Sequence, residues 1–229
     1  MIFGFNACNF SQEKLQFEKK SVEFATNNIS INLEFDYPVV QKNTALSNVR
    51  KQILSEIFEV PTADIITDGC TLATNFFGSE FDEEEYYEKI TTGKSLFTDN
   101  SILTYEIHSY FVCSKGAHGS ITITYFVFDL KTGKRLTEED IFAKNYQEII
   151  TKIMLTKLKE EEEENAHDYN YNLENVKPNG NFSVNEEGIT YLFNPYEIVA
   201  YFGGAPQIFI PYEELTSILK KKSPISSLY

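Results

Sequence analysis

Residues 103–130 decide the fold: they read LTYEIHSYFVC, then SKGAHG, then SITITYFVFDL. On both sides of the hexapeptide at 114–119, the residues are mainly β-branched and aromatic, which is typical of strands. The glycines of the hexapeptide suit a tight connection because they adopt backbone angles that other residues avoid. The sequence therefore predicts two long strands, Leu103 to Cys113 and Ser120 to Leu130, joined by a short loop.

Further strands are expected on both sides of this pair. Residues 29–37 place apolar side chains at every second position, which is the pattern of a strand with one buried face. Residues 182–184 and 189–193 flank a turn that contains Gly188, which predicts a hairpin. Two more strands are expected at 198–202 and 208–210, whereas residues 64–99 follow no regular pattern.

Three segments predict helices. Leu46 to Val60 has apolar residues at helical spacing and ends before Pro61. Tyr146 to Leu158 is amphipathic and leads into five consecutive glutamates at 160–164. The last helix starts at Pro211 and places Leu215, Ile218 and Leu219 inward. Together these elements predict an α+β fold of antiparallel sheets with about three covering helices.

Composition excludes some classes of function. The 229 residues carry 34 acidic and 20 basic side chains, a formal net charge of -14, and 42% of them are hydrophobic. A chain with this much apolar surface can fold, unlike a disordered acidic tail. The negative charge argues against nucleic acid as a partner, because phosphates are bound by Lys and Arg. No cofactor motif is present.

The first residues, MIFGFNAC, resemble the end of a bacterial lipoprotein signal peptide, in which a cysteine after a small residue is lipidated. On this interpretation Cys8 carries the lipid, and membrane contact arises through that anchor alone. The alternative is an ordinary N-terminal stub, since eight residues are fewer than the ~15–30 of a secretory signal. Cys70 and Cys113 fit no zinc-ligand spacing, and they are either buried thiols or a disulfide pair.

Four stretches resemble one known family: SKGAHG, FDLKTGKRLTEEDIF, FSVNEEGITYLFNPYEIVAYFGG and IPYEEL. They are similar to the extracytoplasmic module shared by the anti-sigma factor RsiV, the N-terminal region of the peptidoglycan deacetylase PdaC, and many lipoproteins of Bacteroidetes-type bacteria. The family's glycine-glycine-alanine-histidine turn matches at Gly116, Ala117 and His118, and Gly119 follows. Lys115 replaces the family's first glycine.

The resemblance implies two subdomains, a PdaC-like one at 23–113 and an RsiV-like one at 114–221. A stub or signal remnant at 1–22 and a tail at 222–229 flank them. It also implies a location in the bacterial cell envelope, periplasmic or on the outer surface. The module recognises lysozyme in RsiV, which implies a non-enzymatic binding role here, for a basic protein or a cell-wall fragment. A purely structural domain is a further interpretation.

His118 is the first candidate for chemistry, as a general base, metal ligand or partner contact. The alternative, which we favour, is a structural role within the motif Gly116–Gly119. An enzyme acting on cell-wall glycan would combine His118 with carboxylates such as Asp129 or Asp140, although no catalytic motif supports this. Glu164, His167 and Asp168 form a single E-x-x-H-D group, which is not expected to bind metal.

The acidic run of Asp82, Glu83, Glu84 and Glu85, followed by Tyr86 and Tyr87, is the second candidate. Acidic loops with aromatic neighbours suit a basic protein such as lysozyme, because charge speeds the encounter and the rings supply contact area. The alternative is that these acids only keep the protein soluble. No metal site is expected in this run, because it lacks the alternating pattern of a calcium loop.

Overall fold

The computed structural model describes residues 15–40, 43–79, 82, 84–165 and 170–229. They form two sheets and flanking helices, which confirms the α+β class. The larger sheet has the strand order β1-β2-β3-β4-β5-β6 and the smaller one the order β7-β8-β9. All neighbouring strands are antiparallel except β2 and β3, which run parallel.

The strands of the larger sheet are β1 (Gln16–Ala25), β2 (Ile29–Val39), β3 (Tyr87–Thr98), β4 (Ile102–Cys113), β5 (Ser120–Asp129) and β6 (Lys134–Arg135). The smaller sheet consists of β7 (Phe182–Val184), β8 (Gly188–Leu192) and β9 (Gln207–Pro211). The helices are α1 (Thr44–Ile57), α2 (Gly69–Phe77), α3 (Glu138–Ile141), α4 (Tyr146–Asn165) and α5 (Tyr212–Leu215). Two 3₁₀ turns, η1 (Leu173–Asn175) and η2 (Tyr201–Gly203), complete the described elements.

Several expected elements are present, and others differ. The long strand pair forms β4 and β5, and the two amphipathic helices form α1 and α4. The helix expected after Pro211 is shorter, because α5 ends at Leu215. The strand expected at 198–202 is wrong: a turn and η2 occupy this segment. Residues 64–99, expected to be irregular, contain α2 and the whole of β3.

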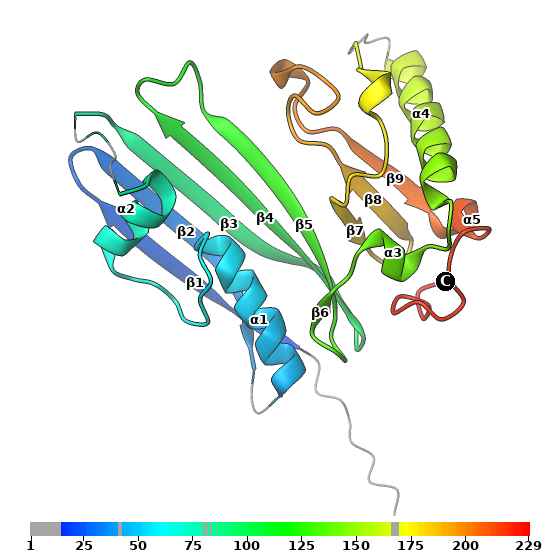
Figure 1. The fold of residues 1–229 in the computed structure, drawn as a ribbon, viewed down its shortest axis with the longest axis horizontal. Helices are drawn as coiled ribbons and strands as arrows, with labels where there is room; N and C mark the ends of the chain where they lie inside the picture. The colour runs from blue at the N-terminus through cyan, green and yellow to red at the C-terminus, as the bar shows by residue number, and fades with distance from the viewer. Residues whose placement is uncertain (1–14, 41–42, 80–81, 83, 166–169) are drawn as a thin grey trace, which may run out of the picture.

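Helix α1 forms where sequence and packing agree. The side chain of Asn43 accepts a hydrogen bond from the Leu46 amide, which caps the first turn. Val49, Ile53, Leu54 and Ile57 recur at helical spacing, and all four are buried. Together with α2, this helix covers one face of the larger sheet (Figure 1). The core between them includes Leu33, Phe35 and Tyr105.

A second core joins the smaller sheet to α4 and to the opposite face of β4 and β5. Alternation along β4 supplies both cores: Leu103 and Tyr105 pack toward α1, whereas Ile102 packs toward the smaller sheet. At the seam the buried Thr104 hydroxyl donates to the Val184 carbonyl over 2.6 Å, and the Val184 amide donates back over 3.3 Å. The expected boundary at 113/114 falls in the loop between the paired strands β4 and β5, and β1 begins within residues 1–22.

Two asparagine side chains occupy the outer edge of β5. The Ile123 amide donates to Asn194 Oδ1 over 2.7 Å, and the Tyr125 amide donates to Asn181 Oδ1 over 2.8 Å. The side-chain amides of both asparagines donate in turn to the Ile123 carbonyl. The two asparagines thus satisfy backbone groups of β5 that no strand pairs. Within the described ranges, no helix is long and apolar enough to cross a membrane.

Candidate functional site

The strand register brings the two candidate segments of the sequence to the same end of the larger sheet. Tyr87, at the start of β3, pairs with Cys113 at the end of β4, and Phe111 pairs with Ser120. The loop 114–119 therefore lies beside the segment that precedes β3. Gln16 pairs with Val39 at the opposite end of the sheet. We call the surface formed by residues 82, 84–86, 114–119 and 194–204 the loop end.

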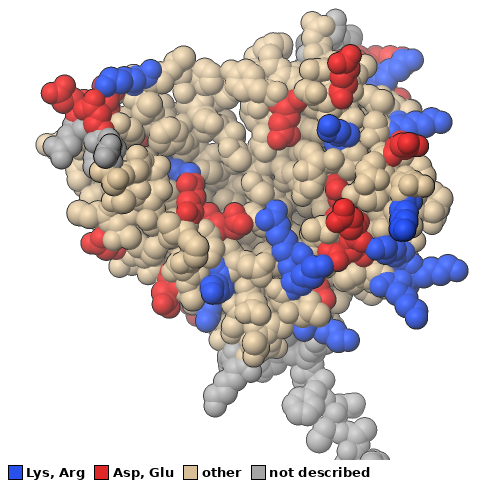
Figure 2. Space-filling view, in the orientation of Figure 1, with Lys and Arg blue, Asp and Glu red and all other residues tan. Residues whose placement is uncertain are grey.

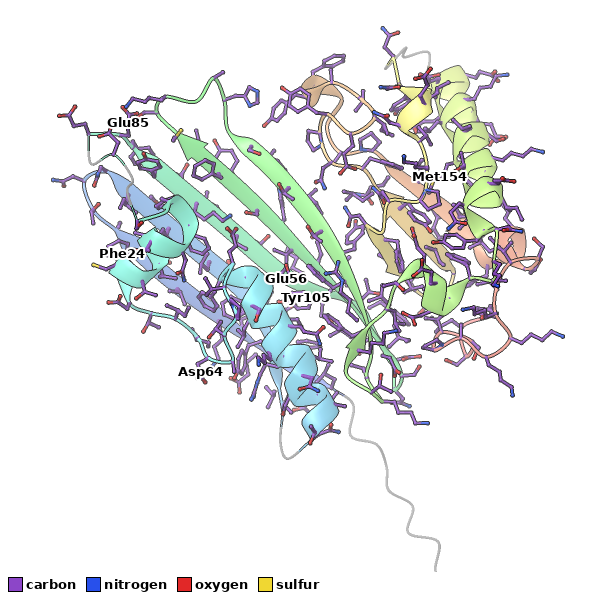
Figure 3. The ribbon with its side chains drawn as sticks, in the orientation of Figure 1. Phe24, Glu56, Asp64, Glu85, Tyr105 and Met154 are labelled. Carbon is purple, nitrogen blue, oxygen red and sulfur yellow. The ribbon has the colours of Figure 1, made fainter. Side chains whose placement is uncertain are left out.

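Lys115 connects the acidic segment to the loop. Its ammonium group lies 2.8 Å from Asp82 Oδ2 and 3.0 Å from Glu85 Oε1. The Ser114 hydroxyl donates to Glu85, and the Tyr86 amide donates to Ser114 Oγ over 3.1 Å. Figure 3 shows Glu85 at this end of the sheet, and Figure 2 shows acidic side chains beside a basic one at the same corner. Lys115 and Ser114 thus hold the two segments together.

These contacts shift the pKa values of Asp82, Glu85 and Lys115. The hydrogen bond from Lys115, supported by the Glu84 amide, lowers the pKa of Asp82 below its usual range. The Ser114 hydroxyl and then Lys115 lower the pKa of Glu85 in the same way. The two carboxylates raise the pKa of Lys115. All three groups are therefore charged at neutral pH, and Lys115 offsets part of the negative charge expected for the run.

His118 connects the same loop to the smaller sheet. Its ring lies 4.5 Å from the ring of Tyr201 and 6.2 Å from that of Tyr196, measured between centroids. Its Nε2 lies 3.1 Å from the Tyr196 hydroxyl, and its Nδ1 lies 2.7 Å from the Gly119 carbonyl. A Cβ at Gly119 would lie 2.2 Å from the Tyr110 ring, so a side chain there would require that ring to move. His118 therefore packs among tyrosines at the loop end.

Large aromatic side chains are exposed around this cluster. The exposed fractions are 63% for Tyr196, 80% for Phe202 and 42% for Tyr86. Tyr196 has a φ of 73°, in the left-handed region that favours glycine. The surrounding turn maintains this conformation, because the Tyr196 amide donates to Val199 O over 2.9 Å. A strained backbone that presents an exposed ring is typical of a binding surface.

The structure does not unite His118 with the carboxylates that an enzyme would need. Asp129 ends β5, so the length of that strand, roughly 30 Å, separates it from the loop that holds His118. Its carboxylate accepts from Lys131 N and Thr132 Oγ1 in the following turn. Asp140 binds Lys134 and caps α3 with Thr137. A catalytic group built from His118 and either aspartate is therefore not formed.

Other predicted residues lie elsewhere or outside the described residues. Cys8, Glu83, His167 and Asp168 fall outside them, as does the side chain of Glu164. Cys70 and Cys113 are free thiols, so the disulfide alternative is not realised. In the described ranges, no three His, Cys, Asp or Glu side chains are grouped so that they could hold a metal ion.

Sequence reasoning missed the aromatic half of the loop end. Tyr196, Tyr201 and Phe202 belong to the segment NPYEIVAYFGG, which was assigned to a turn and a strand. The available signal was Asn194-Pro195 at one end and Gly203-Gly204 at the other, which together are typical of a loop. The assembled surface offers exposed aromatic rings beside charged groups, an arrangement that suits contact with a partner.

The fold and this surface define a two-sheet α+β protein with an acidic and aromatic loop surface. Residues 139–213, from α3 to α5, match the family model described as "Protein of unknown function (DUF3298)". No curated protein matches the chain. It is similar to the crystal structure of a DUF3298 family member from Bacteroides fragilis, with a TM-score of 0.74 and 22% identity over 93% of this chain and 96% of that one.

A DUF3298 family protein from Pseudomonas aeruginosa PAO1 is similar as well. Its TM-score is 0.68 and its identity 17%, over 91% of this chain and 96% of that one. At these identities the likeness shows a shared fold that extends along nearly the whole chain. Residues 139–213 thus match a domain family of unknown function, and the fold of solved members of that family includes the larger sheet.

Proposed function

We propose that this chain is a non-enzymatic binding module of the bacterial cell envelope that recognises a basic protein of the lysozyme type through its loop end. One observation supports this proposal most. The loop 114–119 joins the acidic segment, through Lys115, to the exposed aromatic cluster, through His118. The resemblance to the RsiV and PdaC module, in which RsiV recognises lysozyme, points to the same kind of partner.

The charge of the loop end suits a basic partner even after internal pairing. Asp82 and Glu85 share the cation Lys115 at this corner, and Glu84 lies between them in the sequence. The Glu84 carboxylate has no ion-pair partner among the residues that the structure describes. Excess negative charge speeds the encounter with a basic protein, and exposed aromatic side chains then supply most of the contact energy.

The orientation of the chain is consistent with an anchor at Cys8. β1 begins at Gln16, at the end of the sheet opposite the loop end. A lipid anchor on Cys8 would therefore direct the loop end away from the membrane, toward partners in the envelope. Incorporation of a tagged fatty acid in bacterial cells tests this part of the proposal. We expect the Cys8→Ser variant to lose the label, and a label that persists would exclude Cys8 as the lipidated residue.

Titration of the purified chain with a basic lysozyme, by calorimetry at low and high salt, tests the partner. We expect binding at low salt that weakens several-fold at high salt, because the charges are exposed. Tyr196→Ala and Phe202→Ala should each weaken binding by about tenfold or more. Leu96→Ala is the matched control, since Leu96 is an exposed apolar residue (47%) near the opposite end of β3.

Two results would refute this proposal. The first is no binding at low salt by the correctly folded chain. The second is binding that Leu96→Ala weakens as much as Phe202→Ala does, because the contact would then not involve the loop end.

A further inference from the structure

A polar hollow lies on the helix-covered side of β4 and β5, where α1 and α2 leave the sheet open. Its volume is about 240 Å³. Through Thr124 it adjoins a second hollow of about 570 Å³, which lies between β6, α3 and the loops of the smaller sheet. Figure 2 shows a depression between the two halves of the molecule in this region. We call the first hollow, whose charged groups are described below, the strand groove.

The floor of the first hollow consists of three cross-strand pairs on one face of the sheet. They are Phe111 with Ser120, Ser109 with Thr122, and Ile107 with Thr124. The first and last pairs each place an apolar side chain beside a hydroxyl. The middle pair places two hydroxyls side by side. Three successive pairs span roughly 13 Å along the strands. The floor is thus an elongated surface that offers apolar contacts and hydrogen-bonding groups together.

The charged groups around this floor are already paired. Lys89 is buried and forms an ion pair with Glu59. Glu59 follows the end of α1 and has a φ of 55°. Arg135 Nη1 lies 3.7 Å from Glu56 Oε1, and the Arg135 guanidinium lies 4.2 Å from the Phe126 ring centroid. Figure 3 shows Glu56 on α1, at the groove. An anionic ligand would have to displace a carboxylate from its partner, so the site favours an uncharged one.

A buried hydroxyl beside the floor lacks a partner. Thr91 pairs with Ser109 across β3 and β4, so it continues the middle row of Ser109 and Thr122. It is 2% exposed, and its Oγ1 has no hydrogen-bond partner within the described structure. An unpaired buried hydroxyl is costly, so an ordered water at this end of the middle row would be favourable.

We propose that the strand groove binds a neutral oligosaccharide. Sugar rings present hydroxyls at their edges and C–H groups on their faces. The Ser and Thr hydroxyls of the floor match the hydroxyls of the sugar, and the half-buried Phe111 ring matches its C–H faces. The paired charges Glu56 and Arg135 can donate and accept further hydrogen bonds without imposing a net charge. This site is separate from the loop end and goes beyond the protein-binding function proposed above.

The test uses the purified full chain without lysozyme, because lysozyme itself binds such sugars. The probes are the tetramer of β-1,4-linked N-acetylglucosamine and its deacetylated, positively charged counterpart, followed by NMR titration and calorimetry. We expect the neutral tetramer to bind with a Kd that differs by less than about twofold between low and high salt. Amide shifts should concentrate in residues 107–111 and 120–126.

Isosteric substitutions locate the site. Thr122→Val and Thr124→Val should each weaken binding of the neutral tetramer by about fivefold to tenfold, the effect of one lost hydrogen bond. Thr92→Val is the matched control, because Thr92 pairs with His108 on the opposite face of the sheet. It should leave the Kd unchanged.

Three outcomes would overturn the proposal: no binding of the neutral tetramer, binding of the charged tetramer alone with strong salt dependence, or equal effects of Thr92→Val and Thr122→Val.

Lysozyme binding is measured in a separate titration. Thr122→Val should leave it unchanged, and Tyr196→Ala should leave sugar binding unchanged. Failure of one proposal is therefore distinguishable from failure of the other.

Discussion

The two halves of the β4–β5 pair share one hydrogen-bonding pattern but have different surroundings. From Ile102 to Ile107 and from Tyr125 to Phe128, the strands lie between two cores and are almost fully buried. From His108 to Cys113 and from Ser120 to Ile123, both strands are half-buried or exposed. The covered half connects the two sheets. The open half carries the strand groove and leads into the loop end.

This difference shows how a single pair of strands can serve as both scaffold and binding surface. In the covered half each side chain must fill a defined space in a core, which restricts it to residues such as Tyr105 and Phe128. In the open half the side chains are only half-buried or exposed, so hydroxyl groups occur there at little cost in stability. Rigidity of the covered half in turn fixes the spacing of the open half.

The largest expected effect compares the same substitution in both halves. Phe128 is 1% exposed in the covered half, and Phe128→Ala should lower the free energy of unfolding by about 3–5 kcal/mol through lost burial and a residual cavity. Phe111 lies in the open half, so Phe111→Ala should cost less than half as much. Urea unfolding monitored by circular dichroism measures both. Equal losses would contradict the distinction between the halves.

A smaller effect tests the seam between the sheets. Thr104→Val keeps the shape of the side chain but removes the hydroxyl that bonds to both the amide and the carbonyl of Val184. These groups then lose their partner inside the core, so we expect a loss of about 1–3 kcal/mol. Thr92→Val, outside the seam, is the control in the same unfolding assay. No loss for Thr104→Val would mean that β7 is held to β4 by apolar packing alone.

The smallest effect concerns pH and the loop end. The folded state lowers the pKa of Asp82 and Glu85, so their contacts with Lys115 persist above the ordinary carboxyl pKa and disappear as pH falls through the lowered values. We therefore expect faster amide exchange in residues 114–119 at acidic pH, while unfolding of the whole chain changes little. Lys115→Met should show fast exchange already at neutral pH. Exchange in the parent chain that is independent of pH would show that the carboxylates do not order the loop.

The regular elements were predictable where one face is buried and the other is not. Residues 29–37 and the helices that begin near residues 46 and 146 show this periodicity, and each forms as expected. The strand pair within 103–130 was predictable from its β-branched and aromatic residues instead. β1 lacked such a signal, because it is an edge strand whose burial varies irregularly from Gln16 to Ala25. β3 was hidden by polar residues, since Lys89 and Thr91 occupy buried positions that a pattern of hydrophobicity assigns to solvent.

The candidate site was predictable only in pieces. The sequence indicates the acidic run and the 114–119 loop separately, but their contact depends on the pairing of β3 with β4, and β3 has no regular hydrophobic pattern. The role of Lys115 as a bridge also required the structure, because the sequence shows a lysine in this loop and not which acids it meets.

Asn181 and Asn194 have a consequence for self-association. An uncovered strand edge is a template on which another chain can add a strand, and aggregation often starts there. At Ile123 and Tyr125 the two side-chain amides already hold the backbone groups that such a strand would use. They end the larger sheet without a further strand, and they allow the smaller sheet to lie beside it at its own angle. Two amide side chains thus keep this edge closed to a second copy of the chain.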